Sequence, residues 1–177
     1  MIDSVAKVID RLESIEEIKK LKHIYMDFCD QGYPPAKLGP LFTDDAVWTS
    51  EIFGRFEGRP AIEEFFGGVS SEIVFAAHLA LNGIVDVNGD KATGQWRLLM
   101  PCTLMEDGQK VSRWMLGEYD ETYERHGGKW YFSKLDVFMN FNVRTDESWA
   151  EIASMRSCEN SRRDLSGFTI RGGVSYG

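Results

Sequence analysis

One change of pattern constrains the fold of this chain more than any other feature of its sequence. Up to Gly67-Gly68 the apolar residues recur every three to four positions, and beyond that pair they alternate with polar residues. A period of about 3.6 is typical of amphipathic helices and a period of two is typical of strands. The alternating region predicts four long strands, over residues 73–87, 91–105, 111–123 and 130–143. Helices followed by a run of strands predict an α+β fold.

Short turns separate the four predicted strands, and their composition is that of hairpins. The connectors are Asn88-Gly89-Asp90, Glu106-Asp107-Gly108 and His126-Gly127-Gly128. Glycine, asparagine and aspartate adopt the backbone angles that tight hairpin turns require. The strands are therefore expected to form an antiparallel meander. A sheet of this kind that curls around a helix leaves a hollow, and hollows are common ligand sites.

The N-terminal third is predicted to be mainly helical. Apolar spacing in residues 2–12 indicates one or two amphipathic turns, and Ser14 with Glu17 matches the capping box that starts a new helix. That second helix is expected over residues 15–29, because Gly32 and a Pro-Pro pair follow it. The remaining expected elements are a short helix over 36–42, a turn at 43–45, a strand over 46–52 and a helix that begins at 58.

Length and charge limit the classes of function. A chain of 177 residues is predicted to form one domain over residues 1–145, followed by a C-terminal extension over residues 146–177. The extension is expected to pack on the domain or on a neighbouring subunit, with a further helix at 149–155. A net charge of −8 argues against a surface for nucleic acid or for anionic membranes.

Cysteine content and the N-terminus indicate the cytoplasm. Cys29, Cys102 and Cys158 are odd in number and form no C-x-x-C motif, so neither a disulfide framework nor a zinc site is predicted. The first residues lack the basic and apolar regions of a signal peptide. No apolar run approaches the roughly 20 residues that a membrane span needs.

Five motifs stand in a fixed order between residues 14 and 143. They are Ile15-Glu16-x-Ile18-Lys19-x-Leu21-Lys22-x-x-Tyr25-x-x-x-x-Asp30, Phe42-Thr43-Asp44-Asp45-Ala46-x-Trp48, Gly58-Arg59-x-Ala61-Ile62, His78-x-x-x-Asn82, and Gly117-x-Tyr119-x-x-x-Tyr123-Glu124-Arg125 followed by Trp130-x-Phe132-Ser133-Lys134. In this order and spacing the chain resembles the SnoaL-like branch of the nuclear-transport-factor-two-like superfamily. The resemblance implies a cone-shaped α+β barrel, in which N-terminal helices pack on a strongly curved antiparallel sheet around a central pocket.

Within this superfamily the chain is most similar to the group of scytalone dehydratase, bile-acid 7α-dehydratase and hexachlorocyclohexane dehydrochlorinase. These are cofactor-free lyases with an Asp–His pair, which the resemblance places at Asp30 and His78. Tyr25 stands where the dehydratases have a tyrosine and the dehydrochlorinase a lysine, which favours loss of water. Two departures leave the substrate and leaving group open: Leu135 replaces the dehydrochlorinase's arginine, and Met100 stands near an acidic residue of the bile-acid enzyme.

The residues themselves are compatible with this chemistry, although each has a simpler interpretation. Asp30 follows the negative C-terminal end of a helix, where the macrodipole does not favour a carboxylate. His78 stands in an apolar strand, where a core histidine bonded to a backbone carbonyl is the alternative. If Asp30 reaches the ring of His78, it fixes the tautomer and leaves the other nitrogen as a base. Tyr25 either donates a hydrogen bond to the substrate or packs the helix against the sheet.

Alternation along the strands, together with the alignment, predicts the residues that line the pocket. The six predicted substrate-binding residues are Trp48, Leu98, Met100, Met115, Val137 and Met139. Methionines suit an adaptable apolar cavity, although the same side chains would form an ordinary core in a filled barrel. Trp96 and Trp114 are expected on the outer face of the sheet. Large aromatic side chains there favour a homo-oligomer, either a dimer or a trimer.

Three functions are compatible with these observations. The favoured function is a cofactor-independent lyase, which carries out a dehydratase-like β-elimination on a hydrophobic ring-containing small molecule with Asp30 and His78. The alternatives are an isomerase or polyketide-cyclase-type enzyme in the same pocket, and a non-catalytic small-molecule-binding or accessory subunit. The histidines are scattered and no glycine-rich phosphate-binding motif is present, so neither a metal nor a nucleotide cofactor is predicted.

Overall fold

The computed structural model describes residues 2–150, 169–170 and 174–175. The helical elements are α1 (Ile2–Asp30), α2 (Pro35–Leu38), the 3-10 helix η1 (Gly39–Leu41) and α3 (Arg59–Val69). The strands are β1 (Phe42–Ser50), β2 (Gly54–Glu57), β3 (Ile73–Ala76), β4 (Leu79–Asn88), β5 (Lys91–Glu106), β6 (Gln109–His126), β7 (Lys129–Arg144), β8 (Thr169–Ile170) and β9 (Val174–Ser175). Among the described residues no helix is long and apolar enough to cross a membrane.

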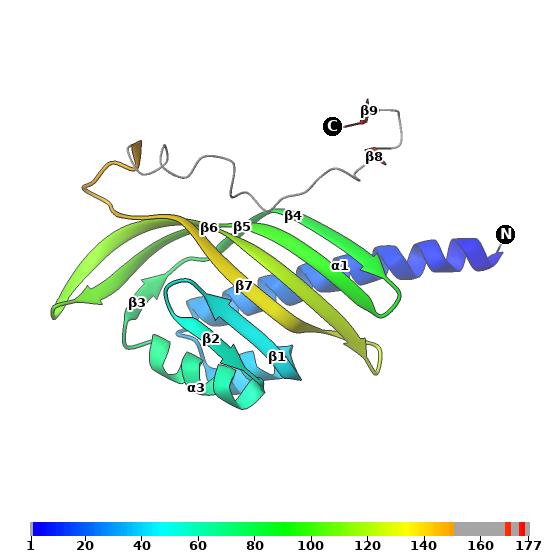
Figure 1. Cartoon of the computed structure of the whole chain (residues 1–177), viewed down its shortest axis with the longest axis horizontal. Helices are drawn as coiled ribbons and strands as arrows, with labels where there is room; N and C mark the ends of the chain where they lie inside the picture. Colours follow the sequence, from blue (N-terminus) through cyan, green and yellow to red (C-terminus); the bar gives the residue numbers. More distant parts are fainter. Residues whose placement is uncertain (1, 151–168, 171–173, 176–177) are drawn as a thin grey trace.

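A curved sheet forms the body of the molecule, and α1 lies across one of its faces (Figure 1). The strand order is β2-β1-β7-β6-β5-β3, and β4 also pairs with β5. Strands β4 to β7 form the predicted antiparallel meander, and glycines with positive φ occupy its turns. The predicted α+β class is confirmed. The sheet is mixed, because β1 runs parallel to β7. It is also open, because the strands at the two ends of the order, β2 and β3, do not pair with each other.

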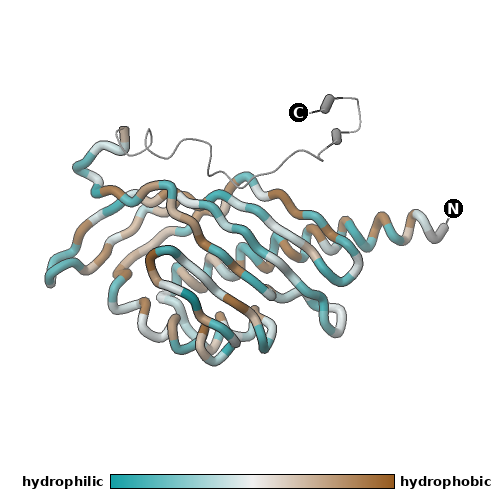
Figure 2. Tube along the Cα trace, viewed as in Figure 1, coloured by the Kyte–Doolittle hydropathy of each residue, from teal (hydrophilic) through white to brown (hydrophobic). Residues whose placement is uncertain are grey.

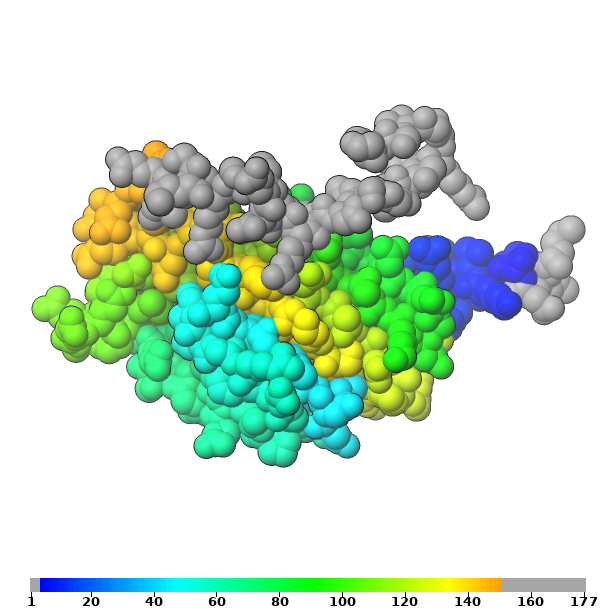
Figure 3. Space-filling view, viewed as in Figure 1, coloured from blue at the N-terminus to red at the C-terminus, as the bar shows by residue number. Residues whose placement is uncertain are grey.

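Helix α1 is one continuous element of 29 residues, so the predicted helix start at the Ser14 capping box is wrong. Ser14 is buried within the helix, and its hydroxyl accepts a hydrogen bond from Arg125 at 3.3 Å. A tertiary contact therefore uses the oxygen that a cap would have used. The N-terminal turns of α1 extend past the strands (Figure 3), which leaves the apolar side chains of Val5, Val8 and Leu12 exposed.

Two further predictions about the chain path are wrong. Residues 43–45 do not form a turn but belong to β1, which pairs with β7 through a register shift between Phe42 and Val47. The single strand predicted over 73–87 is interrupted at residues 77–78, where the backbone N–H of Ala77 donates to the carbonyl of Pro101. Strand β2 was not predicted. Of the helix predicted at 149–155, residues 151–155 lie outside the described part of the chain, as does most of the predicted extension.

The core lies between α1 and the concave face of the sheet, and side-chain alternation along the strands is visible as bands of hydropathy in Figure 2. Trp96 belongs to this core: it is 3% exposed, and its indole N–H donates to the hydroxyl of Tyr123. The prediction that Trp96 faces outward is therefore wrong. Even-numbered residues of β5 pair with odd-numbered residues of β6, so Trp96 and Trp114 lie on opposite faces.

Candidate functional site

A cavity of about 280 Å³ opens on the concave face of the sheet. Helices α1 and α3 and strands β1, β5, β6 and β7 all contribute to its wall, which is mostly aromatic and aliphatic. All six residues predicted to bind substrate line this cavity: Trp48, Leu98, Met100, Met115, Val137 and Met139. The side chains of Tyr25 and His78 line it as well, and Asp30 lies behind His78. The catalytic and substrate-binding roles of these residues stay predictions.

Asp30 and His78 are held together by three contacts on one carboxylate. The Oδ1 atom of Asp30 lies 2.6 Å from Nδ1 of His78, and the backbone N–H of His78 donates to both carboxylate oxygens at 2.9 and 3.2 Å. A carboxylate accepts hydrogen bonds, so Nδ1 of a neutral imidazole carries the proton. Nε2 is then the unprotonated nitrogen. The side chain of His78 is 7% exposed and that of Asp30 is 33% exposed, so the ring is the enclosed partner.

The break between β3 and β4 explains this geometry. A residue inside a regular strand gives its backbone N–H to the neighbouring strand, and its side chain points to one face only. His78 lies in the break, so its N–H and its ring both reach the carboxylate at the C-terminal end of α1.

Tyr33 is a further site residue that sequence analysis missed. Its hydroxyl lies 3.2 Å from Nε2 of His78, and its ring packs edge-on against the imidazole. Burial raises the pKa of Tyr33, so the hydroxyl is protonated and donates to the nitrogen lone pair. Its backbone has a φ of 56°, which is unusual outside glycine. Its position between Gly32 and a Pro-Pro pair marks only a helix end, so the sequence carries no signal for this contact.

Tyr25 has a polar partner of its own at the cavity wall. The indole N–H of Trp48 donates to its hydroxyl at 3.1 Å, which orients the phenol. Burial raises the pKa of Tyr25 well above its usual value. The hydroxyl is therefore neutral and can act as a hydrogen-bond donor, but not as a base.

A buried ion pair that sequence analysis also missed lies beneath the cavity. Lys22 donates to the carboxylate of Glu121, which also accepts a hydrogen bond from Tyr123, and neither charged side chain is exposed. The ammonium of Lys22 lies 3.2 Å from the ring centroid of Tyr119, which lines the cavity. Burial lowers the pKa of Lys22 and raises that of Glu121. The pair is thus linked to the cavity through the ring of Tyr119.

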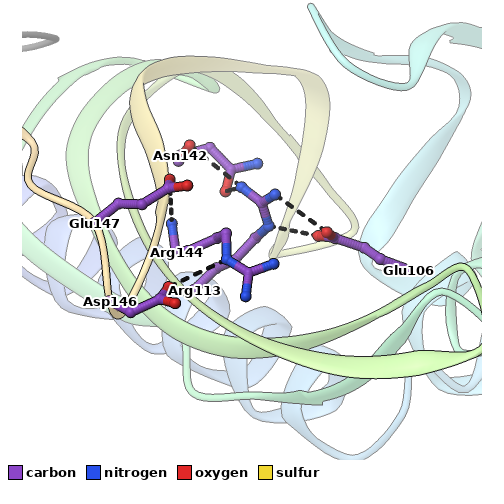
Figure 4. Close-up of polar contacts among 6 residues, drawn as sticks. All are labelled: Glu106, Arg113, Asn142, Arg144, Asp146 and Glu147. Carbon is purple, nitrogen blue, oxygen red and sulfur yellow. Dashed lines mark hydrogen bonds and ion pairs between the residues drawn. The ribbon is translucent and has the colours of Figure 1, made fainter.

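The end of the cavity beside the β5–β6 hairpin is polar, and we call Glu106, Arg113 and Asn142 the polar end (Figure 4). Arg113 binds both oxygens of Glu106, at 2.5 and 3.3 Å. Its Nη1 group donates to the backbone oxygen and to Oδ1 of Asn142, at 3.4 and 3.1 Å. Glu106 and Asn142 line the cavity, whereas Arg113 stands behind them.

Neither a metal centre nor a reactive thiol was found in the described part of the chain. Among those residues no group of three or more His, Cys, Asp or Glu side chains is placed to hold a metal ion. Burial raises the pKa of Cys102 to about 11 and also raises that of Cys29. Both thiols are therefore protonated, and a thiolate nucleophile is not available from them.

Comparison with known proteins identifies relatives of this fold. The family model of the SnoaL-like domain matches residues 10–136. The gamma-hexachlorocyclohexane dehydrochlorinase of Sphingobium indicum is 28% identical over 138 residues, which cover 75% of this chain and 85% of the relative.

Solved structures of two such relatives share the fold of this chain. A hexachlorocyclohexane dehydrochlorinase from Novosphingobium barchaimii superposes with a TM-score of 0.71 at 27% identity, covering 79% of this chain and 95% of that one. A putative scytalone dehydratase from Novosphingobium aromaticivorans has a TM-score of 0.67 at 18% identity, with coverages of 77% and 91%, and it bears on the fold alone. Because the family model spans most of the sequence and the solved relatives share its fold, this chain belongs to the SnoaL-like domain family.

Proposed function

We propose that this protein is a cofactor-independent lyase that eliminates a small leaving group from a hydrophobic ring-containing molecule. The observation that carries the proposal is the 2.6 Å contact between Asp30 and Nδ1 of His78, a residue that lines an apolar cavity together with Tyr33, the hydrogen-bond partner of its Nε2. Dehydrochlorinases among the relatives carry out the same class of reaction, as their name states, and so support it.

The proposed reaction is a β-elimination with His78 as the base. Nε2 takes a proton from a ring carbon, the C–H electron pair becomes a carbon–carbon double bond, and the leaving group departs from the neighbouring carbon with its own electron pair. Asp30 stabilises the imidazolium that forms. Because Tyr33 donates to Nε2 in the free protein, substrate must displace that hydrogen bond before the proton transfer.

The side chains at the cavity wall indicate which kind of leaving group the site favours. Leu135 is fully buried and offers no charge to a departing anion. Tyr25 is a neutral donor at the cavity wall, and a neutral donor suits a departing hydroxyl more than a halide. An isomerase would use the same base and return the proton to another carbon, without expelling a group. A non-catalytic binder would use only the apolar wall.

Substitution of Asp30 by Asn tests the pair. The variant keeps the size of the side chain but removes the charge that stabilises the imidazolium, so kcat/KM should fall by about 10²- to 10⁴-fold. The assay is mass spectrometry of products from a panel of hydroxylated and halogenated ring compounds. Loss of water or of hydrogen halide identifies a lyase, and a product of unchanged mass identifies an isomerase.

Asp27→Asn provides the matched control for this experiment. Asp27 lies on the same helix, one turn before Asp30, and its carboxylate bonds the exposed side chain of Gln31. The control variant should retain full activity. Equal activity of the Asp30→Asn variant and the wild-type protein would exclude the Asp–His pair as the catalytic base. A panel without turnover favours the binding function instead.

We also propose that the outer face of the sheet is an interface between copies of this chain. Phe75, Leu79 and Leu81 are exposed there, and each pairs with a residue of β5 that faces away from the cavity. The exposed apolar side chains on β3 and β4 are the kind that subunit contacts cover.

A further inference from the structure

The cavity has two chemically different ends, and only one of them contains the Asp30–His78 pair. Beside the β5–β6 hairpin the wall changes from apolar side chains to the polar end. We infer that Asn142 is a specificity-determining residue, whose amide N–H groups bind a neutral oxygen of the ligand at the end remote from His78. This inference rests on the proposal that the cavity binds a small molecule, but not on elimination.

Strand register places Asn142 across the sheet from His78. Met100 of β5, which lies beside the β3–β4 break, pairs with Met115 of β6, and Met115 pairs with Asn142 of β7. Three strand spacings therefore separate the break from Asn142, which corresponds to about 14 Å along the sheet. A group bound to Asn142 is too distant to take part in proton transfer at His78. Its contribution would be to select and orient the ligand.

Arg113 determines which way the Asn142 amide points. A guanidinium can only donate hydrogen bonds, so the group 3.1 Å from its Nη1 must be the amide oxygen of Asn142. The amide nitrogen, with its two N–H groups, makes no contact with the other residues drawn in Figure 4. Glu106 holds the guanidinium through two further bonds, which fixes the orientation of the whole cluster. Asn142 thus presents donors at the cavity wall.

Charge at this end selects a neutral ligand group. Glu72 and Glu106 both line the cavity here, and the guanidinium of Arg113 already pairs with Glu106. A carboxylate or phosphate on the ligand would approach these two acidic side chains. A ketone or hydroxyl oxygen accepts from the Asn142 amide without that repulsion. The ligand class is therefore a hydrophobic ring compound that carries a carbonyl or hydroxyl group opposite its reacting carbon.

The test compares two probes that differ only in one oxygen, 1-tetralone and its hydrocarbon tetralin. Binding of each is measured by equilibrium dialysis, which needs no turnover. Asn142→Asp keeps an oxygen for Arg113 but removes the amide donors. We expect it to weaken binding of 1-tetralone by about three- to tenfold, the effect of one hydrogen bond, and to change tetralin binding less than twofold.

Asn140→Asp is the matched control, because it adds the same charge on β7 at a residue that does not line the cavity. It should leave both affinities unchanged. Equal losses for the two probes in Asn142→Asp, no loss for either, or no binding of either probe to the wild-type protein would each overturn the inference. The binding test does not depend on the activity assay of the Asp30→Asn variant. Elimination can therefore fail while the preference for the ketone persists, and the preference can fail while elimination persists.

Discussion

Lys22 and Glu121 place opposite charges where neither side chain has any exposed surface. Removing one partner of such a pair leaves the other charge buried and unpaired, which is more damaging than removing both. The exposed pair of Lys19 with Glu16, on the same helix, offers a direct comparison. Because solvent screens an exposed pair, its contribution to the free energy of unfolding is small.

We therefore expect Lys22→Met to lower the free energy of unfolding by about 3–5 kcal/mol, and Lys19→Met by less than about 1 kcal/mol. Urea denaturation of both variants measures the difference. Addition of Glu121→Gln to Lys22→Met should recover part of the loss, because it removes the orphaned carboxylate. Equal losses in the two single variants would mean that the pair is effectively solvated.

At the scale of secondary-structure elements, the contact between β6 and β7 leaves no room for a side chain at Gly117. A Cβ atom there would lie 2.5 Å from the backbone oxygen of Phe138, at a register shift between the two strands. The neighbouring strand would have to move. By contrast, a Cβ atom at Gly68 in α3 would have no neighbour within 4 Å.

Gly117→Ala is expected to lower the free energy of unfolding by about 1–3 kcal/mol through overpacking. Gly68→Ala should raise it by up to about 1 kcal/mol, because alanine is the better helix former. Thermal denaturation of both variants gives the comparison. A Gly117→Ala protein as stable as the wild type would show that β6 and β7 separate easily at this shift.

The elements that were predictable from sequence are those determined locally. The hairpins carry turn residues, and the strands between them alternate, so the meander followed from local patterns. The parallel pairing of β1 with β7 joins segments far apart in the chain and has no local signal. Ser14 matched a capping box, but its contact with Arg125 comes from β6, over a hundred residues away.

The candidate site shows the same contrast between residues with a sequence signal and residues placed by long-range structure. Asp30, His78 and the six lining residues came from a resemblance and from alternation, and the structure brings them to one cavity. Tyr33 was missed because its contact depends on an unusual backbone conformation. Asn142 was missed because a register shift in the β6–β7 pairing, between residues 116 and 117, changes which residues of β7 face inward.

At the scale of the whole molecule, two exposed apolar surfaces compete as candidates for a subunit contact. One is the outer face of β3 and β4, with Phe75, Leu79 and Leu81, and the other is the stripe on the projecting turns of α1 that includes Val5 and Val8. The proposed interface is the first, because a sheet face presents more continuous apolar area than a single helix stripe.

Leu79→Asp is expected to convert an oligomer of the 20.1 kDa chain into monomers, because it places a charge in the centre of the interface. Val5→Asp, an equivalent change on α1, should leave the oligomer intact. Sedimentation equilibrium measures the masses. A wild-type protein that sediments as a monomer would contradict the proposed interface, and dissociation by Val5→Asp alone would assign the contact to the helix.

The inward-facing row along β5 also bears on how this architecture diversifies. Glu106 lies at the hairpin that joins β5 to β6, whereas Met100 of the same row lies beside the β3–β4 break that holds His78. Because side chains alternate with a period of two, an insertion of two residues in each strand at this hairpin would lengthen the row by about 6.6 Å and preserve every orientation. The hairpin end of the cavity wall can therefore grow in paired steps at a surface turn, without any change at the histidine.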